Sequence, residues 1–378
     1  MNLRNAKSGK ILAITSVIFC IVTAFVIYNR YGVYQNHLDI VNHRDYENSS
    51  QSLVYKDCSQ LVQTWGSIVS SHGIKNSATF ILAARNGQTS VKKIDEYILR
   101  PQCQLQPGHI TTIYVGAQYL QSFSKLIQYV PFNFVLISGD ADTTVPDDIS
   151  GWKDILASKH MLRWYAQNLA WQNAHAVDDS YKLRHLPIGL DLHTLHTRAA
   201  NVAHWGPAAT PMEQVGQLMD VASVAPDFRS RIPQLFCNFH LNTPQRSYFF
   251  VTHTADRAEA EISLRSIRNV AFFQDTKKNR LDTWTEQSRY AFVASPHGVG
   301  LDCHRTWEAL ALGSVPVVKT SPLNHLYDDL PVLIVDSWDA VTPALLADKQ
   351  KEFASKFSKF NLKRLTLQYW LDEISRMT

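Results

Sequence analysis

The sequence predicts an α/β protein in which two Rossmann-like, doubly wound domains follow an N-terminal transmembrane helix. Three observations support this prediction. The chain has 378 residues, enough for about two domains of ordinary size. Short apolar runs alternate with helical stretches from residue 56 onward, a pattern typical of parallel sheets covered on both faces. A long uncharged stretch lies close to the N-terminus.

The composition excludes several other classes of protein. Hydrophobic residues make up 45% of the chain, and 15 Gly and 15 Pro are ordinary numbers, which argues against disordered, collagen-like and low-complexity chains. The 37 Lys+Arg nearly balance the 33 Asp+Glu, giving a net charge of +4. Because the basic residues are also scattered, we expect no nucleic-acid partner.

The N-terminus is typical of a type II signal anchor. Residues 11–28 carry no charge, and this length is at the short end of what spans a hydrocarbon core of ~30 Å. Arg4, Lys7 and Lys10 precede the stretch, so the positive-inside rule leaves residues 1–10 as a cytoplasmic tail. We therefore expect a single-pass anchor with the rest of the chain on the far side of the membrane.

A cleaved signal peptide is the alternative, but its apolar region is normally only ~7–15 residues long. A polar stem is expected over residues 29–55, and it contains a glycosylation sequon at Asn48. Cys20 lies in the anchor, which leaves four cysteines beyond the membrane and two disulfides with three connectivities. We expect each of these four cysteines to be structural or unpaired. They are Cys58, Cys103, Cys237 and Cys303.

The first domain is predicted over residues 56–200. Strands are expected at residues 78–84, 110–115 and 132–138, with a helix around residues 91–99. The segment from residue 184 to 195 closes this block. The aromatic residues Trp164, Tyr165 and Trp171 have helical spacing, which is more typical of a core than of a sugar-stacking surface.

The second domain is predicted over residues 233–348, after a linker at residues 201–232 that is rich in small residues and proline. A C-terminal helix is expected at residues 349–378. Strand and helix signals alternate through the second domain as in a doubly wound sheet. The expected strands lie at residues 235–241, 270–274, 291–295, 315–319 and 332–335, and the expected helices at residues 246–268, 282–290 and 302–312.

The most informative stretch is SPHGVGLDCHRTWEALALGSVPVV, residues 295–318. The end of a strand is expected at the start of this stretch, and a loop with Gly298 and Gly300 follows. A helix is then expected to start at Asp302, the expected N-cap. Glycines let backbone N–H groups approach an anion closely, and the N-terminus of a helix favours negative charge. Since ligands of open α/β sheets bind at the carboxyl ends of strands, this loop predicts an anion site.

Side chains of the same helix indicate which anion is bound. His304 and Arg305 lie in the first turn, where positive charge opposes the helix dipole unless an anion is present. Glu308, one turn further, is placed to accept hydrogen bonds from both hydroxyls of a ribose. A solvated Arg305–Glu308 pair, worth ~0.3–0.5 kcal/mol, is the alternative. We favour a nucleoside-diphosphate site, with Arg246 and Arg257 as further phosphate candidates, although a solvated face is the expectation for Arg257.

This stretch resembles the nucleotide-sugar-binding region of exostosin-like glycosyltransferases, which have the two-domain GT-B fold. Their pattern is a loop with Pro and Gly, an Arg, a Glu-Ala pair and Gly-x-x-Pro-Val. The resemblance covers about 25 residues, and the first domain shows no comparable stretch. The matching positions are Pro296, Gly298, Arg305, Glu308, Ala309, Gly313, Pro316 and Val317.

The resemblance implies an inverting transfer of a sugar from a nucleotide donor without a cofactor or an essential metal. By analogy, Glu308 holds the ribose, while Arg305 and the loop from Gly298 to Gly300 meet the diphosphate. It also implies a Golgi membrane protein if the host is eukaryotic, with the catalytic domain lumenal.

Such a reaction needs a general base on the acceptor hydroxyl, which we expect from the first domain. Asp140 follows an apolar run, and Asp191 lies two residues before His193. Asp140-Ala141-Asp142 also matches the DxD motif with which GT-A glycosyltransferases hold Mn²⁺, and a turn with capping aspartates is its ordinary explanation. No histidine pair has the spacing of a metal site, so we expect no structural metal.

The sequence thus predicts a membrane-anchored glycosyltransferase that acts on a glycan or glycoprotein acceptor. The alternatives are a metal-dependent GT-A enzyme and a non-catalytic subunit of the same fold that binds carbohydrate or stabilises a partner. The oligomeric state is left open between a monomer, a homodimer and a heterodimer.

Overall fold

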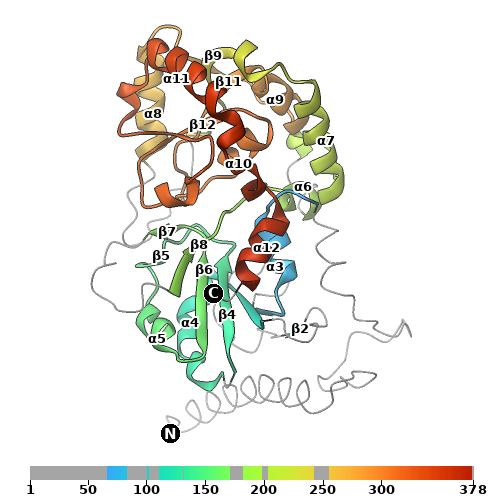
Figure 1. Cartoon of the computed structure of the whole chain (residues 1–378), viewed down its shortest axis with the longest axis vertical. Coiled ribbons are helices and arrows are strands. Elements are labelled where there is room, and N and C mark those ends of the chain that lie inside the picture. The colour runs from blue at the N-terminus through green and yellow to red at the C-terminus, as the bar shows by residue number, and fades with distance from the viewer. Residues whose placement is uncertain are drawn as a thin grey trace, which may run out of the picture.

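The computed structural model describes residues 66–82, 100–101, 110–130, 132–170, 182–197, 203–241 and 255–376. These residues form a mixed α/β protein with two largely parallel sheets, one in each of two lobes (Figure 1). The first lobe contains the six-stranded sheet and the second lobe the five-stranded sheet. A separate pair of short strands, β5 (Val145–Pro146) and β7 (Leu169–Ala170), lies beside the first sheet.

The first sheet has the strand order β2-β1-β3-β4-β6-β8. All neighbouring strands are parallel except β2, which runs antiparallel to β1. From β1 to β8 the parallel strands follow chain order, but β2 lies on the other side of β1, so the strand order reverses between β1 and β3. Their bounds are β1 Phe80–Leu82, β2 Arg100–Pro101, β3 Thr112–Gly116, β4 Phe134–Gly139, β6 Met161–Ala166 and β8 Leu183–His185.

Helices cover both faces of this sheet. Alternate residues of each strand point to opposite faces, so Leu136 packs with α4 (Leu120–Ser124) and α5 (Trp152–Ala157), whereas Ile137 packs on the other side. That other side is covered by α3 (Ser71–Ser77) and by α12 (Leu367–Ser375), which returns from the end of the chain. Both faces of the sheet are therefore buried.

The second sheet is wholly parallel, in the order β10-β9-β11-β12-β13. This is the doubly wound order 2-1-3-4-5, which reverses between β9 and β11. The strands are β9 Ile232–Cys237, β10 Ala271–Phe273, β11 Tyr290–Ala294, β12 Val315–Lys319 and β13 Leu333–Val335. The helices α8 (Asp256–Ser266) and α11 (Pro343–Lys356) pack on one face, and α9 (Arg280–Gln287) and α10 (His304–Ala311) on the other.

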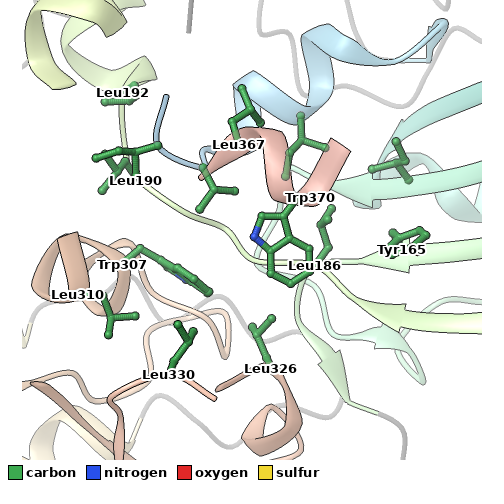
Figure 2. Packing of buried hydrophobic residues seen from close by; sticks show 14 of the residues in the cluster. Tyr165, Leu186, Leu190, Leu192, Trp307, Leu310, Leu326, Leu330, Leu367 and Trp370 are labelled. Carbon is green, nitrogen blue, oxygen red and sulfur yellow. The ribbon is translucent and has the colours of Figure 1, made fainter. Parts of the chain in front are cut away.

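One hydrophobic cluster joins the two lobes (Figure 2). It brings Trp307 of α10 in the second lobe together with Leu186 and Tyr165 of the first. Trp370 of α12 belongs to the same cluster, and Tyr165 Oη donates to the carbonyl oxygen of Glu373 at 2.8 Å. The lobes are therefore packed against each other through a continuous core.

Most expected elements of the second domain are present with shifted ends. β12 has the bounds expected, whereas α10 begins at His304 rather than Asp302. One expectation was wrong: Trp164 and Tyr165 lie on strand β6 and not on a helix. The expected linker contains helix α7 (Pro211–Val224), and the C-terminal segment is divided between two helices, α11 and α12.

Several expectations concern residues outside the described part of the chain. They are the cytoplasmic tail, the anchor, the stem, the helix at residues 91–99, and the residues Cys20, Asn48, Cys58, Cys103, Trp171 and Arg246. None of the helices that the structure describes is long and apolar enough to cross a membrane. Of the described cysteines, Cys237 and Cys303 are both unpaired.

Candidate functional site

The carboxyl ends of both sheets meet between the lobes. In the first lobe, Asp140 follows β4 and Asn168 follows β6. In the second lobe, Asn238 follows β9 and Ser295 follows β11, on the two sides of the point where the strand order reverses. Open α/β sheets bind their ligands at such a topological switch point, so the fold itself places a site here.

The loop after β11 is held by buried hydrogen bonds. The amide of His297 donates to Asp256 Oδ2 at 2.8 Å, and Trp338 Nε1 donates to Asp256 Oδ1 at 2.7 Å. The amide of Gly298 donates to the carbonyl oxygen of Gly300 at 3.0 Å. This loop is therefore fixed by its own contacts, and ligand binding requires little reordering of it.

Two guanidinium groups lie at the switch point. Arg305 Nε donates to Asn238 Oδ1 at 2.8 Å, while its Nη1 is buried and has no hydrogen-bond partner among the described residues. Arg257 donates to the carbonyl oxygens of His297 and His240, at 3.3 and 2.9 Å. The expectation of a solvated face for Arg257 was wrong, because α8 starts close enough to the loop for its side chain to reach it.

The space beside Gly298 is taken by one of these groups. A Cβ atom at Gly298 would lie 2.8 Å from Arg257 Nη2, so glycine is what lets the guanidinium approach the loop. The partners of both arginines are neutral oxygens rather than carboxylates. Such an arrangement of positively charged donors suits a bound anion.

The pKa values of neighbouring groups report an excess of positive charge. Burial lowers the pKa of His240, and Arg305 and Arg257 lower it further. Burial also lowers the pKa of the Arg305 guanidinium, and the positive charge of Arg257 lowers it further. The negative charge of the nearby Glu308 raises this pKa. The site at the switch point is thus positively charged and only partly neutralised by the protein.

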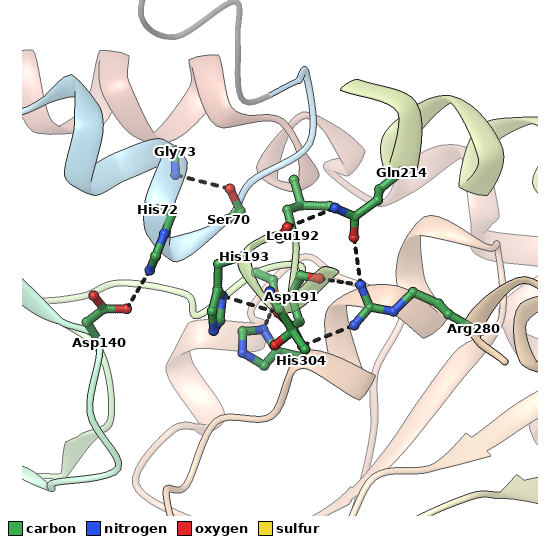
Figure 3. Close-up of polar contacts among 12 residues, drawn as sticks. Ser70, His72, Gly73, Asp140, Asp191, Leu192, His193, Gln214, Arg280 and His304 are labelled. Carbon is green, nitrogen blue, oxygen red and sulfur yellow. Dashed lines mark hydrogen bonds and ion pairs between the residues drawn. The ribbon is translucent and has the colours of Figure 1, made fainter. Parts of the chain in front are cut away.

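The remaining residues of the predicted donor site separate into two groups. Glu308 is half-buried on α10, one turn beyond Arg305, so its charge acts on the arginine. His304 faces the first lobe instead, with Nδ1 2.7 Å from the carbonyl oxygen of Gly189 (Figure 3). The structure therefore places Glu308 near Arg305 and turns His304 away from them.

Asp302 and Gly300 connect the lobes. The expectation that Asp302 caps α10 was wrong: the N-cap is Cys303, without a side-chain cap bond. The carboxylate of Asp302 instead accepts from the amide of Ile188 at 2.8 Å, and its own amide donates to Asn168 Oδ1 at 2.8 Å. Gly300 packs so closely on Asn168 that an added Cβ would lie 3.0 Å from its side-chain nitrogen.

Asp140 lies at the carboxyl end of β4 with a left-handed backbone, φ 62°. It accepts from Lys75 Nζ at 2.6 Å and lies 3.1 Å from His72 Nε2, and its amide donates to Gln167 at 3.0 Å. Burial opposes ionisation of this carboxyl, but His72 and Lys75 together hold its pKa well below the usual range. Asp142 is exposed, two residues further.

Asp191 is more deeply placed and is held by Arg280. The guanidinium donates to Asp191 Oδ2 at 3.0 Å, and the amide of Thr194 donates to Oδ1 at 3.0 Å (Figure 3). Burial raises its pKa, but His304, His193 and Arg280 outweigh that effect and keep the pKa well below the usual range. Burial lowers the pKa of His193 to about 4, so this imidazole is neutral at physiological pH.

Sequence reasoning missed the partners of both carboxylates. His72 and Lys75 lie on the short helix α3, where no motif marks them, and Arg280 begins α9 in the other lobe. Asn168 is a further omission, and its position directly after a strand was the available signal. Arg246 lies outside the described residues.

No protein family matches the chain, and no curated protein matches it. Similar folds include a UDP-forming α,α-trehalose-phosphate synthase from Burkholderia vietnamiensis, with 13% identity, a TM-score of 0.34 and coverage of 71% of this chain and 75% of that one.

Two further structures are similar to this chain. One, from E. coli, is described as trehalose-6-phosphate bound with UDP-2-fluoro glucose, with 10% identity, a TM-score of 0.34 and coverage of 72% and 74%. The other is a UDP-forming α,α-trehalose-phosphate synthase from Burkholderia xenovorans in complex with glucose-6-phosphate, with 11% identity, a TM-score of 0.30 and coverage of 70% and 71%. The exostosin-like resemblance stays a prediction, and our case for the function rests on the geometry of the site.

Proposed function

We propose that this protein is an exostosin-like glycosyltransferase of the GT-B type. It transfers a sugar from a nucleotide-sugar donor to a glycan or glycoprotein acceptor, with inversion and without a metal on the donor diphosphate. The observation that carries the proposal is the guanidinium pair at the switch point of the second sheet. Arg305 is bound there to Asn238 and Arg257 to the glycine-containing loop, and the hydrogen-bond partners of both are neutral oxygens.

The donor diphosphate binds to these two arginines. Negative charge develops on the diphosphate as the sugar leaves, and preorganised cations stabilise that charge in the transition state. A divalent metal performs this task in enzymes that depend on one, whereas here Arg305 and Arg257 supply two positive charges. Gly298 lets the backbone of the loop come close to the phosphates, and Glu308 on the next turn of α10 accepts hydrogen bonds from the ribose.

The acceptor binds against the first lobe, where Asp140 is the stronger candidate for the catalytic carboxylate. The Asp140 side chain is 22% exposed, so an acceptor hydroxyl can reach it, whereas the Asp191 side chain is 8% exposed and bound by Arg280. We assign Asp191 a positioning role that holds the segment after β8. Because Lys75 and His72 keep Asp140 ionised, its carboxylate can accept a hydrogen bond from the acceptor hydroxyl.

The DxD alternative gains no support from the arrangement of the first lobe. Asp140 is bonded to Lys75, and Asp142 is exposed. Among the described residues, the cluster of three possible ion ligands includes neither of these aspartates. A GT-A mechanism through these two aspartates would need Asp140 to leave its cationic partners.

The membrane anchor and the Golgi location are part of the proposal and are supported by the sequence pattern alone. A glycosidase-sensitive shift in mass that depends on Asn48 would place the stem in the lumen. An unshifted chain in a cell that glycosylates its secreted proteins would contradict the type II orientation.

The enzymatic claim is tested by measuring donor hydrolysis and transfer with a panel of UDP-, GDP- and CMP-sugars. We expect turnover of one donor class by the wild type and loss of turnover in Arg305→Met. The matched control is Arg289→Met, since Arg289 is an exposed arginine just after α9 that forms an ion pair with Glu286. Turnover that survives Arg305→Met, or that Arg289→Met reduces equally, would contradict the proposed donor site.

A further inference from the structure

A second cluster of side chains lies on the first-lobe side of the donor helix. Asp191 and His193 follow β8, and His304 is the first residue of α10 (Figure 3). One oxygen or nitrogen atom from each of these three residues lies within 4.8 Å of the others. The donor-site proposal does not use this cluster, whose members come from both lobes.

The histidine from the second lobe is held in a defined tautomer. His304 Nδ1 lies 2.7 Å from the carbonyl oxygen of Gly189. A carbonyl oxygen can only accept, so Nδ1 carries the proton and Nε2 of the neutral ring keeps its lone pair. Histidines that bind metals are commonly fixed in this way by a hydrogen bond to the backbone.

The two carboxylate oxygens of Asp191 have different neighbours. Its Oδ2 accepts from Arg280 at 3.0 Å, whereas Oδ1 lies 3.2 Å from His193 Nδ1. The arginine thus anchors one oxygen and leaves the other beside the imidazoles. The ring of His193 is itself stacked on His72, with 4.5 Å between the ring centroids, which restricts its orientation.

We propose that Asp191, His193 and His304 bind one divalent transition-metal ion, of the class to which Zn²⁺ and Co²⁺ belong, and that this ion links the two lobes. Two imidazoles and one carboxylate suit such ions better than Mg²⁺ or Ca²⁺, which prefer oxygen ligands. Ligand distances of about 2.0–2.2 Å place tetrahedral ligands roughly 3.4 Å apart. The three ligand atoms already lie within 4.8 Å of one another, so a small approach of the side chains closes the site, and a fourth position is left for water.

No signal in the sequence marked this site, since the expectation of no metal rested on the spacing of histidines along the chain. Only the packing of the lobes brings His304 to the other two ligands. This ion does not bind the donor diphosphate. In the proposed function that diphosphate is bound by Arg305 and Arg257 and needs no metal. The proposal consequently stands or falls independently of the proposed sugar transfer.

Co²⁺ titration of the metal-stripped full-length protein, followed by visible absorption, tests the site. We expect one equivalent of Co²⁺ to give the d–d band of a low-symmetry site with nitrogen ligands, and Zn²⁺ to remove it. The band should be lost in both His193→Gln and His304→Gln. The matched control is His325→Gln, because His325 is an exposed histidine that pairs with Asp328.

Thermal unfolding supplies a second readout that does not depend on the spectrum. Zn²⁺ binds the folded state and should raise the Tm of the wild type and of His325→Gln, but not that of either ligand variant. Absence of the band in the wild type, or its persistence in His193→Gln and His304→Gln, would overturn the proposal. If one variant is unfolded before metal is added, the other variant decides the result, because each of the two removes a different ligand.

Discussion

Replacing Asp302 with asparagine tests the connection between the donor helix and the first lobe. The Asp302 side chain is buried, and burial raises its pKa from 3.8 to about 6, even though backbone and indole N–H groups donate to it. The donors are the amides of Ile188 and Cys303 and the indole of Trp307, at 2.8, 2.9 and 3.0 Å. An asparagine side chain keeps the shape of the aspartate but cannot titrate.

The pKa sets the sign and size of the effect. Because the folded-state pKa lies above the unfolded value, the folded protein keeps a proton that the unfolded chain has released. The stability from this proton is fully present below pH 3.8 and is lost as the pH rises through about 6. The whole change corresponds to about 3 kcal/mol, of which about 2 kcal/mol falls between pH 4.5 and 7.

The assay is urea unfolding of the wild type and Asp302→Asn across this pH range. The free energy of unfolding of the wild type minus that of the variant should fall by about 2 kcal/mol from pH 4.5 to 7, while groups common to both proteins cancel. Fluorescence and circular dichroism should give coincident transitions for the analysis to hold. The exposed Asp339 provides the control Asp339→Asn. A difference that is flat or rises with pH would refute the burial of Asp302 between the lobes.

Three further predictions concern the donor site, the backbone and the acceptor side. Arg305→Met should weaken nucleoside-diphosphate binding by roughly 10–100-fold, the range for losing a hydrogen bond to a charged group; an unchanged Kd in calorimetry would contradict the donor site. Gly189→Ala should lower the free energy of unfolding by about 2 kcal/mol or more, because φ is +65° and the new Cβ would overlap the carbonyl oxygen of Val69. Its control is Gly216→Ala, where a Cβ meets nothing within 4 Å, and equal effects in the two variants would show that the backbone argument is mistaken. Asp140→Asn should reduce transfer by about 100-fold without changing nucleotide affinity, and full activity of this variant would remove Asp140 from the mechanism.

The second lobe was largely predictable because its signals are local. Apolar runs such as residues 315–319 become buried parallel strands with the expected ends. The stretch around Arg305 carried enough glycine and charge to indicate an anion site at the end of a strand. By contrast, helix α7 falls in the expected linker, although Thr210 and Glu213 form a capping box around Pro211, which was a usable signal.

The acceptor side could not be predicted from sequence because its contacts join distant segments. Asp140 was chosen for its place after an apolar strand, but nothing local indicated that Lys75 would bond to it. His304 was expected to face the donor since it opens the helix, yet the packing of Trp307 orients that end of the helix toward the first lobe. Asp302 failed as a cap for a similar reason: its carboxylate bonds across the lobes to Ile188.

Calorimetric titration of the protein with UDP, GDP and CMP, each with and without Mn²⁺, tests the central claim most directly. We predict binding of one nucleotide class with equal affinity in both conditions, and loss of that binding in Glu308→Ala. Binding that requires Mn²⁺ and is lost in Asp142→Ala would contradict the account and move the donor to the DxD motif. Failure of the folded protein to bind any of the nucleotides would contradict it as well and would favour a non-catalytic subunit.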